Sequence, residues 1–165
     1  MLNIELKERT ASHVSIYWNK TQDSEIKKLL PCAAGSEEEA LAMFRQTLLP
    51  GAASYGRTIY CCDQYVGDIW CYGIDLKKER SAMVSYCIFE KQLWNRGIAT
   101  SALGLFLQDI FTRYPLEKAG AFSYTQNPAS IAVLKKQGFC FVEEFEEKGI
   151  VSQYLEYRPC SQASV

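Results

Sequence analysis

The feature that most constrains the fold is a strand-to-helix junction between residues 81 and 111. A β-branched and aromatic run, SAMVSYCIF (81–89), precedes WNRGIATSALGLFLQDIF (94–111), in which apolar residues recur at helical spacing. A strand followed by a helix and another strand builds a crossover between parallel strands. The junction passes through Gly97, which serves either tight packing or an anion bound at the helix start.

The segments around this junction predict one mixed α/β (α+β) domain over residues 1–165, since no repeat or linker divides the chain. Residues 57–63, 65–74 and 81–89 are separated by short turns, which favours an antiparallel meander. The other expected elements are strands over 2–9, 119–124, 140–147 and 150–157, and helices over 21–30, from Ser36 to Leu48, and from Pro128.

The composition excludes several classes of protein. Hydrophobic residues make up 48% and charged residues 22%, which is typical of a globular protein. The net charge of −1 provides no positive field that would attract nucleic acid. No apolar run is long enough to span a membrane, and the charged N-terminus does not resemble a signal peptide, so we expect a cytoplasmic location.

The seven cysteines form no CxxC pair, and His13 is the only histidine. This argues against a zinc site and against a serine or cysteine hydrolase that needs a histidine base. The odd number of thiols predicts buried, reduced cysteines, and His13 is expected on the surface or in a capped loop.

A second helix carries strong boundary signals. Asn127 is placed to cap its N-terminus, Pro128 occupies its first position, and Gly138 follows its end. If Gly138 closes the helix, Leu134 should contact Phe139. The junction at Gly97 contains neither of the phosphate-binding patterns GxxxxGK[ST] and GxGxxG. Both this junction and the second helix also permit a purely structural interpretation.

Together the two segments resemble the GNAT superfamily of acyl-CoA-dependent N-acetyltransferases, and within it the RimJ/RimL-type branch. The turn Trp94-Asn95-Arg96-Gly97-Ile98-Ala99 is similar to the cofactor turn of that branch, and Thr100 continues it. Asn-x-x-Ser followed by Leu-x-Lys-x-Gly-Phe matches at Asn127, Ser130, Leu134, Lys136, Gly138 and Phe139. The resemblance implies a mostly antiparallel central sheet of about six to seven strands, flanked by helices.

The resemblance also implies a binding site for acetyl-CoA, without a metal. The diphosphate would rest on main-chain N–H groups of Trp94, Asn95, Arg96, Gly97, Ile98, Ala99 and Thr100. The pantetheine arm would lie where strand 81–89 parts from strand 119–124, against unpaired main-chain groups of Cys87, Ile88 and Phe89. Asn127 and Ser130 would face the pantetheine and sulfur end.

The implied reaction is direct attack of an amine on the thioester. Many members of the superfamily use a tyrosine to protonate the thiolate; Leu134 stands at that position here, so Ser130 is the catalytic candidate, or else a plain helix-turn hydroxyl. No general base is assigned: Glu90, Glu143, Glu144, Glu146, Glu147, Asp68 and Tyr154 are the candidates weighed. Trp18, Tyr55, Trp70, Tyr72 and Tyr154 are aromatic enough to line an acceptor pocket, or belong to the core.

Three hypotheses stay open at this point. The chain is an N-acetyltransferase acting on a peptide N-terminus or a small-molecule amine, with a homodimer possible. Alternatively, it is a non-catalytic acyl-CoA-binding regulatory or interaction module, or a small α/β domain whose Gly97 and Gly138 are structural only.

Overall fold

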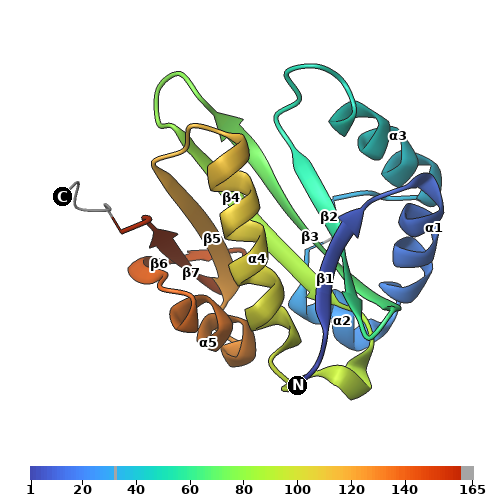
Figure 1. The fold of residues 1–165 in the computed structure, drawn as a ribbon. Helices are drawn as coiled ribbons and strands as arrows, with labels where there is room; N and C mark the ends of the chain where they lie inside the picture. Colours follow the sequence, from blue (N-terminus) through green and yellow to red (C-terminus); the bar gives the residue numbers. More distant parts are fainter. Residues whose placement is uncertain (32, 161–165) are drawn as a thin grey trace.

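The computed structural model describes residues 1–31 and 33–160. They form a seven-stranded sheet in the order β1-β2-β3-β4-β5-β7-β6, with helices on both faces (Figure 1). The strands are β1 (Ile4–Glu8), β2 (Tyr55–Cys61), β3 (Gln64–Asp75), β4 (Ser81–Ile88), β5 (Lys118–Tyr124), β6 (Cys140–Glu147) and β7 (Ile150–Tyr157). The helices are α1 (Ala11–Lys20), α2 (Ser24–Leu29), α3 (Glu37–Thr47), α4 (Ile98–Arg113) and α5 (Pro128–Lys136), and a 3-10 turn, η1, spans Lys91–Leu93.

The sheet confirms the predicted mixed topology. Strands β2, β3 and β4 form the expected antiparallel meander, and β6 and β7 form the closing hairpin. Among the strands of the described residues, only β4 and β5, which α4 connects, pair in parallel. Figure 1 shows α4 and α5 on one face of the sheet, while α1 and α3 lie side by side beyond β1.

The core lies between the sheet and α4. Leu103, Phe106 and Ile110 are fully buried there, as the helical spacing predicts. Ala99, at the same helical spacing in the first turn of α4, is half-buried; it packs against this core and also lines a cavity.

Helix α1 was not predicted. Val14, Tyr17 and Trp18 recur at helical spacing and are buried or half-buried, whereas Ile16 is exposed, so a short helical pattern was present in the sequence. A capping box starts it: the His13 Nδ1 accepts a hydrogen bond from the Thr10 N–H at 3.0 Å. His13 is therefore a helix residue, and its Nε2 lies 2.9 Å from the Tyr60 hydroxyl. Burial and the nearby Arg9 lower the pKa of His13, which favours the neutral ring.

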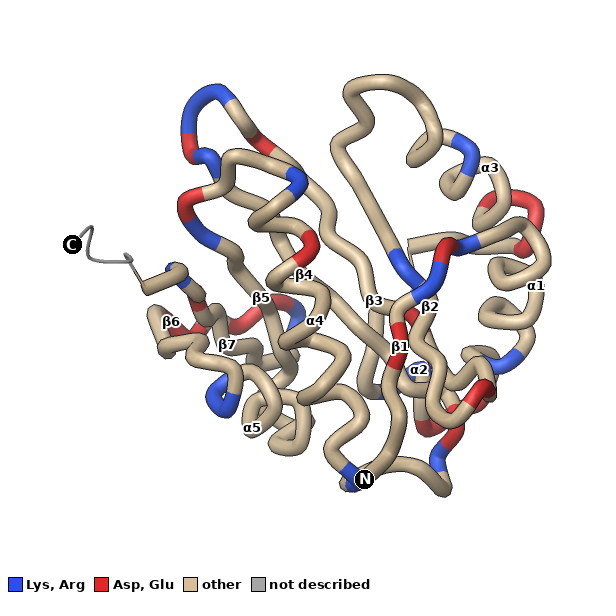
Figure 2. Tube along the Cα trace, viewed as in Figure 1, with Lys and Arg blue, Asp and Glu red and all other residues tan. Residues whose placement is uncertain are grey.

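The cysteine prediction is only partly right. Cys61, Cys71 and Cys87 are buried, but Cys62, Cys140 and Cys160 are exposed, and all six are free thiols. Cys32 lies outside the described residues. Charged residues of both signs are interspersed along the described trace (Figure 2).

Candidate active site

Strands β4 and β5 part to form a groove. Their ladder has three residue pairs and ends at Met83 and Gly120. Beyond this point β4 still pairs with β3, and β5 with β7, so the two strands diverge from each other. The space between them is a cavity of about 610 Å³, lined by β4, the start of α4, β5 and α5.

The main chain of β4 presents alternate residues to this groove. The Phe89 N–H donates to the Val66 carbonyl on β3 at 3.0 Å, so it is not the free group that the resemblance implied. Because hydrogen-bonding directions alternate along a strand, Cys87 also faces β3, and Val84, Tyr86 and Ile88 face the groove. The Ile88 carbonyl accepts a hydrogen bond from the Trp94 indole N–H at 2.8 Å.

The N-terminus of α4 lies at one end of the groove. Gly97 precedes the helix with φ +78°, and it offers no side chain to cap the first turn. Ser101 donates to the Gly97 carbonyl, so the N–H groups of Ile98, Ala99 and Thr100 lie before the helical hydrogen-bond pattern begins. The helix dipole adds partial positive charge at these N–H groups. This end of the groove is suited to an anion.

Most of the sequence-predicted cofactor residues meet around this cavity. Trp94, Asn95, Gly97, Ile98, Ala99, Thr100, Cys87, Ile88, Asn127 and Ser130 line it. Two do not: Arg96 is exposed to solvent outside the lining, and Phe89 is 5% exposed in a cluster with Ile26 and Cys87.

Helix α5 brings its first turn to the groove. The Asn127 side chain accepts from the Ser130 N–H at 3.2 Å, as its predicted capping role requires. At the other end, Phe139 N–H bonds to the Leu134 carbonyl and Gly138 has φ +96°, which completes the predicted helix stop. Both caps fix the position of the Ser130 hydroxyl relative to β4.

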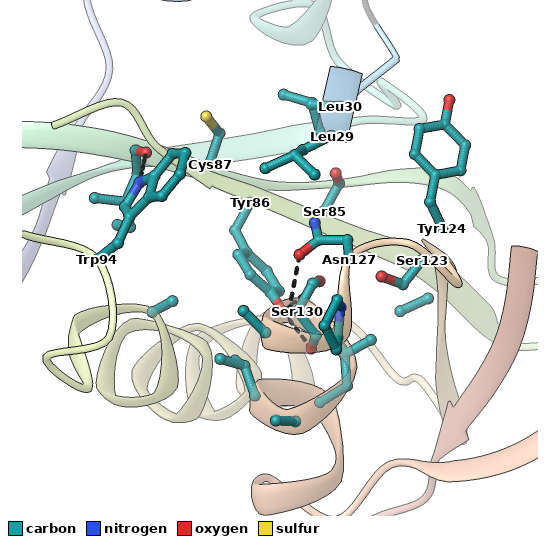
Figure 3. A pocket seen from close by; sticks show the side chains of 18 of the residues that line it. Leu29, Leu30, Ser85, Tyr86, Cys87, Trp94, Ser123, Tyr124, Asn127 and Ser130 are labelled. Atoms are coloured by element: carbon teal, nitrogen blue, oxygen red, sulfur yellow. Dashed lines mark hydrogen bonds between the residues drawn. The ribbon is translucent and has the colours of Figure 1, made fainter. Parts of the chain in front are cut away.

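Tyr86 is a groove residue that the sequence interpretation missed. Its hydroxyl lies 3.0 Å from the Ser130 Oγ and 3.1 Å from the Ser130 carbonyl oxygen (Figure 3). Burial raises the pKa of Tyr86 to about 12, so the phenol stays protonated. Alternation along 81–89 places Tyr86 on the same side as Val84 and Ile88, which was the available signal.

A second cavity, of about 930 Å³, lies on the opposite face of the sheet, between β2–β4 and helices α1–α3. Of the predicted aromatic residues, Trp18, Tyr55, Trp70 and Tyr72 line it, and Tyr154 does not. The two cavities share the lining residues Ile26, Leu30, Pro31, Tyr72 and Ser85. Of these, only Ser85 lies on β4, so a molecule in either cavity can reach Ser85.

The sequence matches the acetyltransferase (GNAT) domain family over residues 4–140. The chain belongs to the GNAT acetyltransferase family. No curated protein matches its sequence.

Solved GNAT structures share the fold at low sequence identity. RimL, a ribosomal protein alpha-N-acetyltransferase in complex with coenzyme A, aligns with a TM-score of 0.80 at 17% identity and covers 94% of this chain and 93% of its own. Aminoglycoside acetyltransferase AAC(6')-Ib with coenzyme A and kanamycin gives 0.78 at 11% identity, covering 96% and 95%. A chimera of spermidine N-acetyltransferase SpeG from Vibrio cholerae and hSSAT gives 0.77 at 15%, covering 94% of each chain.

None of the weighed base candidates of this GNAT domain projects into either cavity. Glu143, Glu144, Glu146 and Glu147 are exposed along β6, outside both linings. Glu90 pairs with Lys20 at 2.8 Å, and this hydrogen bond lowers its pKa. Tyr154 donates to Glu156 at 2.8 Å.

Asp68 is the most strongly perturbed carboxyl group. It is 1% exposed, lies 2.8 Å from an Arg9 guanidinium nitrogen and accepts from the Tyr65 hydroxyl at 2.7 Å. Burial raises its pKa to about 6 despite the opposing effect of Arg9. It lines neither cavity, so we assign it a buried ion pair rather than contact with an amine.

The described residues contain no group of three or more side chains arranged to hold a metal ion. Within the same part of the chain, no helix is long and apolar enough to cross a membrane.

Proposed function

We propose that the chain is an N-acetyltransferase that moves the acetyl group of acetyl-CoA to a primary amine, on a peptide N-terminus or a small molecule, in a ternary complex. The observation that carries this proposal is the groove between β4 and β5, which runs to the uncapped N-terminus of α4. A long ligand with an anionic end and an amide-containing arm matches that combination of free N–H groups and unpaired strand edge.

In the proposed complex, N–H groups of residues 94–100 hold the diphosphate, with Ile98, Ala99 and Thr100 as the central donors. The amide groups of the pantetheine arm pair with the groove-facing main chain of Val84 and Tyr86, as an added strand would. Asn127 and Ser130 border the sulfur end. Arg96 contributes charge at the outer edge of the diphosphate site.

Ser130 is the proposed hydrogen-bond donor to the leaving thiolate. The tyrosine position of the superfamily is Leu134, which is 1% exposed in the core. The Tyr86 hydroxyl instead reaches Ser130 from β4. The single phenolic proton of Tyr86 can go to the Ser130 carbonyl oxygen, at 3.1 Å, or to the Ser130 Oγ, at 3.0 Å. We propose the second arrangement for the reaction, because it leaves the Ser130 O–H to point toward the sulfur, with Tyr86 as a positioning residue.

The shared border of the two cavities is the proposed meeting point of thioester and amine. Holding both reactants there supplies much of the rate acceleration. The amine must be neutral to attack, and an α-amine near pKa ~8 loses its proton to water more readily than a lysine amine near ~10.4. No carboxylate of this chain is given the role of base.

Finer assignments follow from the sequence motifs and remain part of the proposal. The turn at residues 94–100 and the Asn127–Ser130 motif support membership of the RimJ/RimL-type branch. We further propose a single domain over residues 1–165, a cytoplasmic location, and a possible homodimer.

Calorimetry with CoA, followed by release of free CoA thiol with a panel of amines, tests the proposal. We expect CoA binding and amine-dependent thiol release. The second candidate is a non-catalytic acyl-CoA-binding module. Two observations favour it: Leu134 is buried at the position of the superfamily's tyrosine, and none of the carboxylates weighed as a base lines either cavity. CoA binding without thiol release for any amine would support that module, and no CoA binding would refute both.

A further inference from the structure

The second cavity differs from the groove in the charge of its walls. Its charged lining residues are four basic ones and one acidic one: Arg9, Lys27, Arg57, Arg113 and Glu8. We infer that the acceptor is a compact amine with an apolar or aromatic body and a carboxylate, and that polycationic amines are poor acceptors. This inference rests on the proposed function, because it treats this cavity as the acceptor site.

The size and apolar walls of the cavity fit a small molecule or a short peptide end. A volume of about 930 Å³ lies within the usual range for small-molecule sites. Trp18, Trp70 and Tyr72 contribute aromatic surface, and Met43 and Phe44 contribute apolar surface from α3. These side chains favour an apolar body next to the amine.

Two arginines supply the anion-binding character. The Arg57 Nε lies 3.6 Å from one oxygen of Asp109, and an Arg113 terminal nitrogen lies 3.7 Å from the other. The Arg113 guanidinium also lies 4.3 Å from the centre of the Tyr55 ring. One carboxylate thus serves two guanidinium groups, and the Tyr55 hydroxyl takes one of its oxygens at 2.6 Å. The pair retains donors and positive charge for a further carboxylate.

The position of Arg57 and Arg113 sets the carboxylate of the inferred acceptor apart from its amine. Arg57 and Arg113 line the second cavity but not the groove, whereas Tyr72 and Ser85 line both. An acceptor whose amine reaches Ser85 therefore places its other end toward the arginines. This geometry selects a molecule with an amine and a carboxylate at opposite ends of an apolar body.

The remaining charges do not reverse this preference. Arg9 is neutralised by the buried Asp68, Lys27 is exposed, and Glu8 is the single acidic lining residue. The carboxylates of β6 lie outside the lining. A polyamine would thus bring several ammonium groups against basic walls and an apolar surface, where they lose hydration without gaining partners.

The test compares two dipeptides that differ only at the C-terminal carboxylate, together with two polycationic amines. A phenylalanyl dipeptide with a free C-terminal carboxylate is compared with its C-terminal amide, and spermidine and kanamycin represent polycations. Binding to the CoA-loaded protein is measured by calorimetry, and kcat/KM by release of free CoA thiol. We expect at least tenfold tighter binding of the carboxylate form than of the amide, and weaker binding still of both polycations.

Variants of Arg57 and Arg113 test whether these two side chains cause the preference for the carboxylate form. In the double variant Arg57→Gln/Arg113→Gln, the preference for the carboxylate form should fall toward one, while CoA affinity and Tm report whether the fold is kept. Each single variant provides the same readout if the double variant unfolds. Arg45→Gln, which changes an exposed α3 arginine outside the lining, should retain the full preference.

The outcomes distinguish this inference from the proposed function. Equal binding of the two dipeptides, preferred turnover of spermidine or kanamycin, or an undiminished preference in the folded arginine variants would overturn the inference and leave an acetyltransferase in place. Preferential binding of the carboxylate form without thiol release would support the acceptor inference and contradict the proposed reaction.

Discussion

The groove and the second cavity, which is the proposed acceptor site, meet at Ser85 on β4, but they are built in different ways. Most residues that line the groove come from two stretches, 84–100 and 121–136, and the contacts proposed for the cofactor are chiefly with main-chain groups. The acceptor cavity draws side chains from Glu8 to Arg113, spread over many elements. A site made of main-chain groups tolerates most side chains, except where the ligand comes so close that glycine or a small residue is needed. A site made of side chains changes with each substitution. On the proposed function, we expect the groove to depend on few residue types and the second cavity to set the choice of acceptor.

The largest predicted effect concerns the groove. Gly97→Glu should weaken CoA binding on the order of 100-fold, because a carboxylate about 5 Å from the diphosphate costs about 3 kcal/mol at an effective dielectric constant near 20. The space beyond Gly97 is open, so the fold should persist with a backbone cost of about 1 kcal/mol for φ +78°. Calorimetry with CoA measures the effect.

Gly149→Glu is the matched control for this prediction. Gly149 has φ +79° and equally open surroundings, but it lies in the turn between β6 and β7. Its variant should show the same backbone cost and unchanged CoA affinity. Equal losses of affinity in both variants would assign the effect to backbone strain rather than to the anion site.

The next effect tests the reaction centre. Ser130→Ala should lower kcat about 10- to 100-fold, which corresponds to losing a hydrogen bond to a charged group, and should change the KM for acetyl-CoA little. Steady-state kinetics by thiol release measures both constants. A normal kcat would reduce Ser130 to a helix-turn hydroxyl.

Tyr86→Phe should act through Ser130 and have a smaller effect. We expect kcat to fall about 3- to 10-fold, in keeping with one neutral hydrogen bond. In the Ser130→Ala background the same substitution should have almost no effect on kcat, because the group that it positions is gone. Additive losses in the double variant would contradict the positioning role.

These tests also show how far the sequence could lead. Gly97, Asn127 and Gly138 could be interpreted from the sequence because each satisfies a local backbone requirement, and the meander and crossover followed from strand and helix periods. Helix α1 was missed because only Val14, Tyr17 and Trp18 mark its buried face, and because its capping box uses His13 in place of the usual glutamate or glutamine. Tyr86 and Arg57 were missed because their partners, Ser130 and Asp109, lie 44 and 52 positions away in the sequence and meet them only through tertiary packing. Arg113 and Asp109, by contrast, are an i,i+4 pair on α4 that the sequence could have shown.

The smallest predicted effect lies on the acceptor side, in the buried pair of Asp68 and Arg9. The pKa of Asp68 is raised from 3.8 to about 6, so the folded state holds this proton more tightly than the unfolded state between these values. Asp68 therefore makes stability fall as pH rises through that window. Relative to wild type, Asp68→Asn should gain stability between pH 4 and pH 7, as measured by denaturant unfolding at each pH. A constant difference across this range would show that the carboxyl group does not titrate there.

Main-chain N–H groups at the start of α4 are proposed to hold the diphosphate of acetyl-CoA. A crystal structure of the complex with CoA would show whether they do. We expect diphosphate oxygens within hydrogen-bond distance of the N–H groups of Ile98, Ala99 and Thr100, with the pantetheine arm between β4 and β5. Diphosphate bound elsewhere, with the groove empty, would contradict this proposal.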